Sequence, residues 1–143
     1  MKNTKAIVRY AGDSFFIGTP PSGHSLTIDV NGERSSGASP LELLLVALGG
    51  CTGADVVDIL RKKRERLTEY SIEVHGEKRD EYPRGFRRIE VKHILRGRGL
   101  SEKAVAHAIE LSDQKYCSVA ATLRPAAEIV TTYEIQEEPV DQA

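Results

Sequence analysis

The segment from Ser39 to Cys51 reads SPLELLLVALGGC, and it predicts the start of a long central helix. Ser39 is a favourable N-cap, Pro40 suits the first turn, and Glu42 places an acid where the helix dipole favours one. The run LLLVAL that follows is apolar on every side, which is typical of a helix buried all round. A chain of 143 residues can hardly surround such a helix alone, so we expect a second subunit to cover it.

The same helix is expected to continue to a cationic end, from Arg61 to Arg66. Each glycine in a helix interior costs about 1 kcal/mol relative to alanine, which favours a close backbone contact at such a point. The glycines are Gly49, Gly50 and Gly53, so we expect this contact beside Cys51. Cations complement the C-terminal end of the helix dipole, so a solvated helix end is favoured over a nucleic-acid patch.

Alternating apolar residues predict strands on both sides of this helix. Three short strands separated by turns are expected within the first thirty residues, as a meander. Two longer strands are expected at Tyr70–Arg79 and Arg88–Leu95, joined by a hairpin loop.

The C-terminal part of the sequence predicts two more helices and a strand. Ser101 is a candidate N-cap for a second helix, and a short third helix is expected between Cys117 and Pro125. Ala127–Ile135 reads as a last strand. We expect one domain over residues 1–143, with a meander and loop at 1–38, the helices and longer strands at 39–136, and a loose tail at 137–143.

Composition excludes several classes of function. The formal net charge is -1, so no long-range field attracts nucleic acid or an anionic membrane. The longest apolar stretch, Leu43 to Gly53, is shorter than the ~20 residues that cross a bilayer, and the N-terminus does not resemble a signal peptide. We therefore expect a cytoplasmic protein without nucleic-acid or membrane partners.

The two cysteines are the candidate chemical groups, since two are too few for a disulfide scaffold. Cys117 is expected at a helix N-terminus, where unpaired N–H groups favour a thiolate. Cys51 is expected inside a helix, with Asp55 and Asp58 on the same side, and both carboxylates would disfavour a thiolate. The alternative is that both cysteines are inert small hydrophobic residues.

Glu42 is expected on the opposite face of the helix from Cys51, roughly 13 Å along the axis. Its predicted neighbours are apolar, so its carboxyl should be neutral or paired with an arginine. The alternative is an ordinary first-turn acid. The four histidines show no spacing typical of a zinc site, and we expect no metal.

The segment Ser39–Cys51, taken with KYCSVA at Lys115–Ala120, resembles the osmotically inducible protein C / organic hydroperoxide resistance (OsmC/Ohr) family, and its small YhfA-like branch in particular. The resemblance covers nearly the whole chain in element order. It implies an OsmC-like α+β fold with antiparallel sheets and two central helices, in which two subunits intertwine as a homodimer with shared sites.

The resemblance also implies a thiol-dependent peroxidase that serves stress and redox defence. By position, Cys51 matches the peroxidatic thiol that attacks an organic hydroperoxide, and Cys117 matches the resolving thiol that forms a disulfide. Glu42 matches the glutamate that orients a catalytic arginine, and it would act on the partner's thiol or through an intermediary. No bound cofactor is implied; an external dithiol reduces the disulfide, lipoyl groups being the usual donor of that family.

One feature of the family is missing, because residues 10–33 contain no lysine or arginine. The family arginine comes from the N-terminal strands, so its role would fall to another residue. The candidates are Arg34, Arg84, Arg87 and Arg88. This absence favours an alternative function: a non-catalytic module of the same fold that binds a small apolar ligand or a protein, with the cysteines as sensor or core.

Overall fold

The computed structural model describes residues 3–30 and 35–139. The chain forms two compact units that divide between Leu44 and Leu45, inside helix α1 (Pro40–Lys62). The helix begins in the first unit and continues into the second. The expectation of one domain over residues 1–143 stays a prediction.

The first unit is built on the predicted meander. Strands β1 (Ile7–Tyr10), β2 (Phe15–Thr19) and β3 (Leu26–Asp29) form an antiparallel sheet in the order β1-β2-β3. Gly12 and Asp13, at the β1–β2 turn, both have positive φ (104° and 53°). Glycine and aspartate tolerate this conformation, so the turn follows from the sequence.

The second unit contains a three-stranded sheet in the order β4-β5-β6. Its strands are β4 (Arg66–Lys78), β5 (Phe86–Arg98) and β6 (Glu128–Glu137). β4 and β5 form the predicted hairpin, but both are longer than predicted at their charged ends. β6 pairs with β5 in parallel, so the expectation of antiparallel sheets is wrong for this pair. The helical connection between β5 and β6 is long enough to return the chain to the same end of the sheet, which a parallel pair requires.

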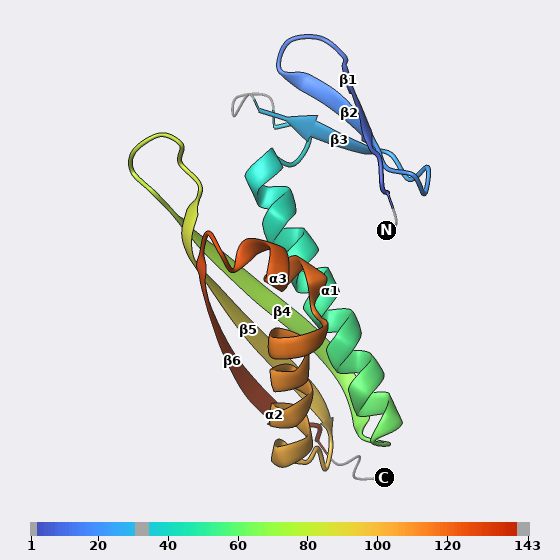
Figure 1. Cartoon of the computed structure of the whole chain (residues 1–143). Helices are drawn as coiled ribbons and strands as arrows, with labels where there is room; N and C mark the ends of the chain where they lie inside the picture. Colours follow the sequence, from blue (N-terminus) through green and yellow to red (C-terminus); the bar gives the residue numbers. More distant parts are fainter. Residues whose placement is uncertain (1–2, 31–34, 140–143) are drawn as a thin grey trace. The chain divides into compact units, whose positions relative to one another are not determined.

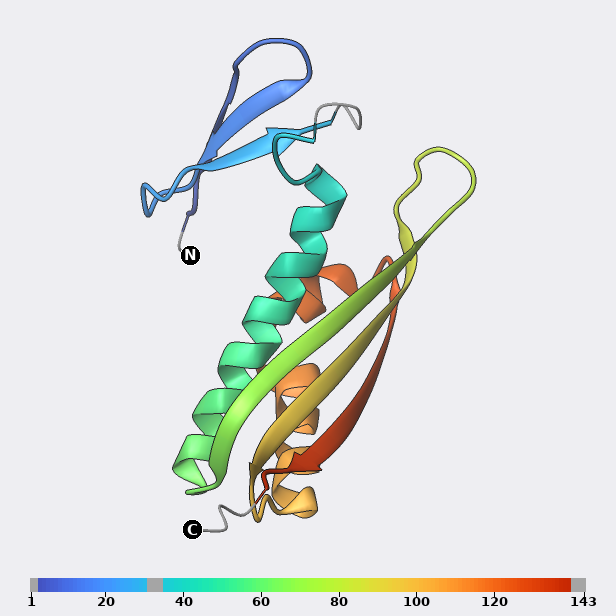
Figure 2. The ribbon, with the colours of Figure 1, turned by 180° about the vertical axis from the view of Figure 1, so that it is seen from behind.

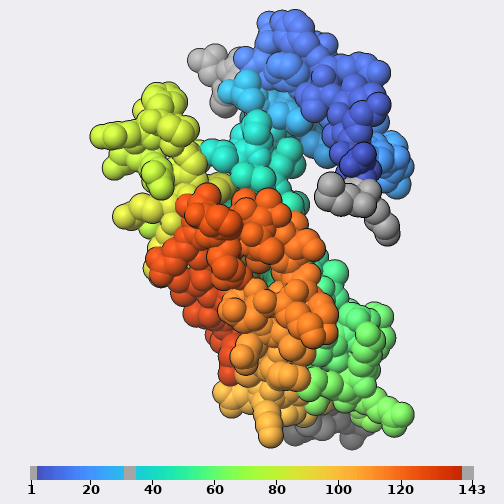
Figure 3. Space-filling view, in the orientation of Figure 1, coloured from blue at the N-terminus to red at the C-terminus, as the bar shows by residue number. Residues whose placement is uncertain are grey.

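The helices of the second unit lie on one face of this sheet, as Figure 1 and the reverse view in Figure 2 show. α1 runs alongside β4, while α2 (Glu102–Leu111), the π-helical turn η1 (Ser112–Tyr116) and α3 (Ser118–Leu123) form the connection to β6. In Figure 3 the orange surface of this connection closes over the helical side of the unit. The core that joins α1, β5 and α2 consists of Val56, Leu60, Leu95, Ala104, Val105, Ala108 and Ile109.

Helix α1 ends at Lys62, four residues before the predicted end at Arg66. Arg64 has φ of 59°, in the left-handed region, and Glu65 N–H donates to Leu60 O at 3.0 Å. Arg66 already belongs to β4. By length and composition, α1 could cross a membrane, but the central helix of a soluble protein has the same properties. α1 also packs on the sheet through Leu48, Val56 and Leu60.

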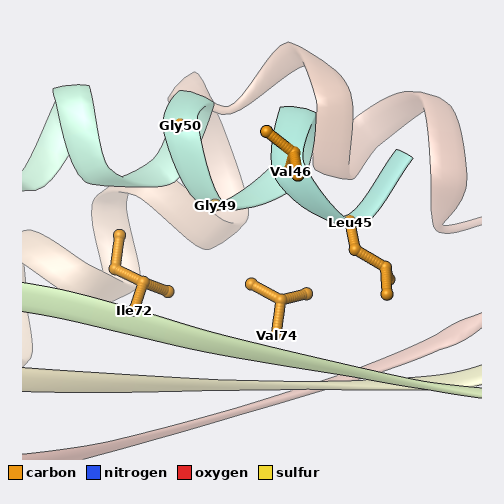
Figure 4. A pocket seen from close by; sticks show the side chains of 6 residues that line it. All are labelled: Leu45, Val46, Gly49, Gly50, Ile72 and Val74. Atoms are coloured by element: carbon orange, nitrogen blue, oxygen red, sulfur yellow. The ribbon is translucent and has the colours of Figure 1, made fainter. Parts of the chain in front are cut away.

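The α1 glycines face strand β4 rather than another backbone. A Cβ on Gly53 would lie 2.7 Å from Ile72 Cδ1, and one on Gly49 would lie 3.3 Å from Val74 Cγ2, whereas one on Gly50 would meet nothing within 4 Å. Figure 4 shows the two side chains of β4 pointing at the glycine segment. The expected close backbone contact is therefore wrong within one chain, because side chains fill the space at two glycines and the third is open.

Candidate functional site

The second unit brings the two cysteines together. Cys51 lies in the middle of α1 and is partly exposed, and Cys117 is the buried N-cap of α3. Although the two are 66 residues apart (117 − 51), the two sulfurs and a carboxylate oxygen of Asp55 all lie within 4.8 Å of one another. Two thiols and a carboxylate therefore share one site.

Asp55 is placed by the regular geometry of α1, because residues four apart lie on the same side of a helix. The expectation that Asp55 lies beside Cys51 is thus confirmed. Asp58 lines the same recess as Asp55, so the two acids do lie on one side of α1. Asp58 is exposed and pairs with Lys62 at 3.0 Å, which offsets its charge.

Cys117 is placed by the turn of π-helix that precedes it. Cys117 N–H donates to Ser112 O at 2.8 Å, five residues back, where an α-helix would use a residue four back. The wider turn keeps Ser112 fully buried at the end of α2 and leaves Cys117 extended, with φ of −74° and ψ of 101°. From there Cys117 Sγ accepts from Ala120 N–H at 3.4 Å. The predicted helix N-terminus at Cys117 is confirmed.

Burial decides the acidity of Cys117. Burial raises the pKa of the Cys117 thiol from 9.0 to about 11, the neighbouring Cys51 adds to the rise, and the N–H groups of Ala120 and Val119 oppose it. The side chain is 3% exposed. The N–H groups of the helix N-terminus favour a thiolate at Cys117, as expected, but desolvation outweighs these two hydrogen bonds.

Two buried hydroxyls connect α1 to the π-helical turn at this site. Thr52 Oγ1 and Ser112 Oγ are 2.8 Å apart, and Ser112 Oγ donates to Asp55 Oδ2 at 2.8 Å. Neither hydroxyl was among the candidate residues predicted from the sequence. Ser112 could have been identified as a polar residue in line with the apolar face of α2.

Glu42 forms a reciprocal cap at the start of α1. Ser39 N–H donates to Glu42 Oε1 at 3.1 Å, and Glu42 N–H donates to Ser39 Oγ at 3.2 Å. This is the capping-box arrangement, and Glu42 is exposed. The cap agrees with the alternative of an ordinary first-turn acid, and the role of Glu42 at a thiol site stays a prediction.

The candidate arginines have other partners, where they are described. Arg34 lies outside the described residues. Arg84 donates to the carbonyl of Asp80, Arg87 pairs with Glu77, and Arg88 pairs with Glu90 and Glu128. Over residues 3–30 and 35–139, no cation donates a hydrogen bond to either sulfur.

A buried histidine lies in the same unit. His93 is fully buried on β5, and its Nδ1 is 2.6 Å from Tyr70 Oη. Burial lowers the pKa of His93 to about 4, and Asp113 opposes this. Burial raises the pKa of Tyr70, and Asp55 adds to the rise. Both rings are therefore neutral near pH 7, and the tautomer of His93 sets which of the two donates.

A recess of about 370 Å³ reaches this site at Asp55. Its lining mixes apolar and charged side chains: Asp55, Asp58, Ile59, Lys62, Lys63, Leu111 and Tyr116. A small molecule with an apolar body can therefore approach the carboxylate next to the sulfurs.

The same three residues are the ones that could hold a metal ion. Two thiolates and a carboxylate are ligand types that zinc accepts. A disulfide between Cys51 and Cys117 would remove two of the three ligands, so metal binding and disulfide formation exclude each other at this site.

The sequence and the fold are similar to those of known proteins and solved structures. The chain is 40% identical to Protein YhfA of Escherichia coli (strain K12) over 132 residues, which are 92% of this chain and 97% of that protein. A hypothetical protein from Aquifex aeolicus VF5 superposes with a TM-score of 0.87 at 31% identity, over 97% of this chain and 100% of that chain.

An organic hydroperoxide resistance protein from Elizabethkingia anophelis has the same fold, with a TM-score of 0.69 at 14% identity over 95% of this chain and 98% of that chain. Residues 32–132 match the family described as OsmC-like protein. The resemblance drawn from the two cysteine segments is confirmed, and the chain belongs to the OsmC-like protein family.

Proposed function

We propose that this protein is a thiol-dependent peroxidase that reduces organic hydroperoxides, with Cys51 as the peroxidatic and Cys117 as the resolving cysteine. The observation that carries the proposal is the distance between the sulfurs, at most 4.8 Å, between residues on separate helices. A disulfide needs about 2.05 Å between its sulfurs, a gap that side-chain rotation and small backbone shifts close. Family membership and the fold shared with hydroperoxide resistance proteins support a redox or stress function.

The different burial of the two thiols supports their assigned roles. Cys51 is partly exposed, so its thiolate attacks the terminal oxygen of R–O–O–H. The O–O bond breaks, the alkoxide takes a proton to leave as R–OH, and Cys51 becomes a sulfenic acid. The buried Cys117 is shielded from hydroperoxide and attacks the Cys51 sulfur, whereupon the S–O bond breaks and water leaves. An external dithiol, such as a lipoyl group, returns two electrons and two protons.

A homodimer completes this proposal. Val46 of α1 is 69% exposed and Leu44 is 38% exposed, so the apolar surface of α1 favours a covering partner. In such a dimer Glu42 would act on the partner's thiol site, as the family resemblance implies. Replacing Val46 with aspartate should convert a dimer to monomers in sedimentation, whereas His107→Asp, also at an exposed helical position, should not. The proposed location is the cytoplasm.

The direct test of the activity is hydroperoxide consumption by the full chain with a dithiol donor. We expect turnover of tert-butyl or cumene hydroperoxide and no turnover by Cys51→Ser. Absence of turnover with both probes and several dithiols, together with two free thiols after a stoichiometric dose, would reject the proposal.

A second function of another class is favoured by a specific observation. Leu45, Val46, Gly49, Gly50, Ile72 and Val74 line an apolar recess of about 430 Å³ (Figure 4), and no described cation lies on either sulfur. A non-catalytic module that binds a small apolar ligand or a protein would use this recess and keep the cysteines as sensor or core. It predicts ligand binding unchanged in Cys51→Ser and no hydroperoxide turnover.

A further inference from the structure

The peroxidase proposal leaves Asp55 without a role. Its carboxylate lies within 4.8 Å of both sulfurs, and a negative charge there would by electrostatics alone disfavour a thiolate. Among the described residues no lysine, arginine or histidine forms an ion pair with Asp55 that would cancel this charge. A purely structural carboxylate would be better placed at the surface, as Asp58 is.

The hydrogen bonds around Asp55 have a definite direction. Ser112 has one hydroxyl proton and donates it to Asp55 Oδ2 at 2.8 Å. Ser112 Oγ must therefore accept in its 2.8 Å contact with Thr52 Oγ1, so Thr52 is the donor. Both hydroxyls are buried, with Thr52 5% and Ser112 0% exposed. The chain Thr52 to Ser112 to Asp55 thus fixes one carboxylate oxygen and leaves the other as an acceptor.

The buried thiol needs such an acceptor. Cys117 is 3% exposed, and burial of a thiol away from water disfavours its thiolate form. A thiol that must attack a sulfenic acid in this state gains from a base that takes its proton during the attack. Asp55 lies within reach of both sulfurs, directly or through one water molecule.

We infer that Asp55 is the proton-transfer group of both thiol steps, with Ser112 and Thr52 as positioning residues; the inference rests on the peroxidase function proposed above. In the first step Asp55 accepts the Cys51 S–H proton as sulfur attacks the hydroperoxide, and gives it to the departing alkoxide. In the second step Asp55 accepts the Cys117 S–H proton as the S–S bond forms, and gives it to the departing hydroxide, which leaves as water. Asp55 ends each step unchanged, so protons and electrons balance. The recess that opens at Asp55 admits the hydroperoxide to this carboxylate.

The test compares Asp55→Asn with Glu110→Gln, which also removes one negative charge, from an exposed residue of α2. Asparagine keeps an acceptor for Ser112 but cannot take a proton. Stopped-flow single turnover with tert-butyl hydroperoxide should show disulfide formation about 100-fold slower in Asp55→Asn and within about twofold of wild type in Glu110→Gln. Added formate should restore part of the rate in Asp55→Ala and should not affect Glu110→Gln.

The outcomes separate this inference from the function on which it rests. An active wild type with an unchanged or faster Asp55→Asn would overturn the proton-transfer role alone, because a merely opposing charge predicts acceleration. A wild type that neither consumes hydroperoxide nor forms the disulfide would overturn both.

Ser112→Ala provides a second test that leaves Asp55 in place. Ser112→Ala should slow disulfide formation about tenfold in the same assay. Added to Asp55→Asn, it should slow disulfide formation no further, since Ser112 acts only by positioning the Asp55 carboxylate. Additive losses in the double variant, or formate rescue of Ser112→Ala, would contradict the assigned positioning role.

Discussion

The middle of α1 and the turn from η1 to α3 both present a thiol to Asp55, but the two regions are built differently. Cys51 sits in regular helix, one turn before Asp55, and is partly exposed. Cys117 follows a π-helical turn, accepts a backbone hydrogen bond, and is 3% exposed. The helix terminus favours a thiolate at Cys117, yet burial raises the pKa of that thiol. In this molecule burial outweighs position in a helix, and the difference in burial supports the proposed roles of the two thiols.

The largest expected effect comes from removing each thiol in turn. Cys51→Ser should lower hydroperoxide consumption by at least roughly a thousandfold, because the nucleophile is lost. Cys117→Ser should consume one equivalent and then stop, leaving a sulfenic acid on Cys51 that dimedone labels. Consumption by Cys51→Ser, or a label on Cys117 in that variant, would reverse the assignment of the two regions.

The pair His93 and Tyr70 interacts with acids of both regions. Asp113 of η1 raises the pKa of His93, and Asp55 of α1 raises the pKa of Tyr70. His93 has a pKa of about 4 when folded and 6.5 when unfolded. The unfolded chain therefore binds more protons as the pH falls from 6.5 to 4, and stability should fall by about 3 kcal/mol over that window. This contribution of His93 to stability is fully present above pH 6.5 and fully lost below pH 4.

Urea titrations of wild type and His93→Gln at several pH values measure this contribution. Glutamine cannot titrate and can still bond to Tyr70. The difference in unfolding free energy between the two proteins should shrink as the pH falls through the window. A difference that stays constant from pH 7 to pH 4 would contradict a lowered pKa for His93 in the folded protein.

Alkylation compares the two thiols in one experiment. Burial raises the pKa of Cys117 to about 11, which lowers its thiolate population, and shielding from solvent slows its reaction further. Iodoacetamide should therefore label the partly exposed Cys51 faster than Cys117, as followed by peptide mass mapping. Equal rates, or faster labelling of Cys117, would mean that the helix terminus dominates after all.

The smallest effect is expected at the anchor of the Cys117 turn. Arg124 Nη2 donates to Asp113 O at 2.7 Å and to its Oδ1 at 3.1 Å, which ties η1 to the end of α3. Arg124→Ala should cost about 1 kcal/mol or less, because the pair is partly exposed. Hydrogen exchange at Cys117 N–H should rise while that at Cys51 stays the same; equal changes at both would contradict a local anchor.

Local patterns predicted the elements of this fold, but not how they combine. Alternation identified the meander and the β4–β5 hairpin, N-cap residues identified α1 and α2, and the segment before Pro125 identified α3. The parallel pairing of β6 with β5 depends on the path of the connection, which no local pattern encodes. The π-helical turn adds one residue to a helical turn, and its five residues, SDQKY, carry no distinctive signal.

The site was predictable only as far as helix periodicity extends. The spacing of Cys51, Asp55 and Asp58 correctly placed both carboxylates on one side of α1. It could not show that Asp58 is exposed and pairs with Lys62. The hydrogen bonds of Ser112 join residues 57 and 60 positions apart in the chain, so they follow from tertiary packing alone. The acidity of Cys117 was misjudged for the same reason, since burial is a property of the whole unit.

The most direct test of the central claim is to treat the reduced protein with one equivalent of tert-butyl hydroperoxide, block free thiols in denaturant, and map the peptides by mass. The account predicts a Cys51–Cys117 disulfide within one chain and no blocked thiol at either position. Two blocked thiols, or a Cys51 oxidised beyond the sulfenic acid with Cys117 still free, would contradict it.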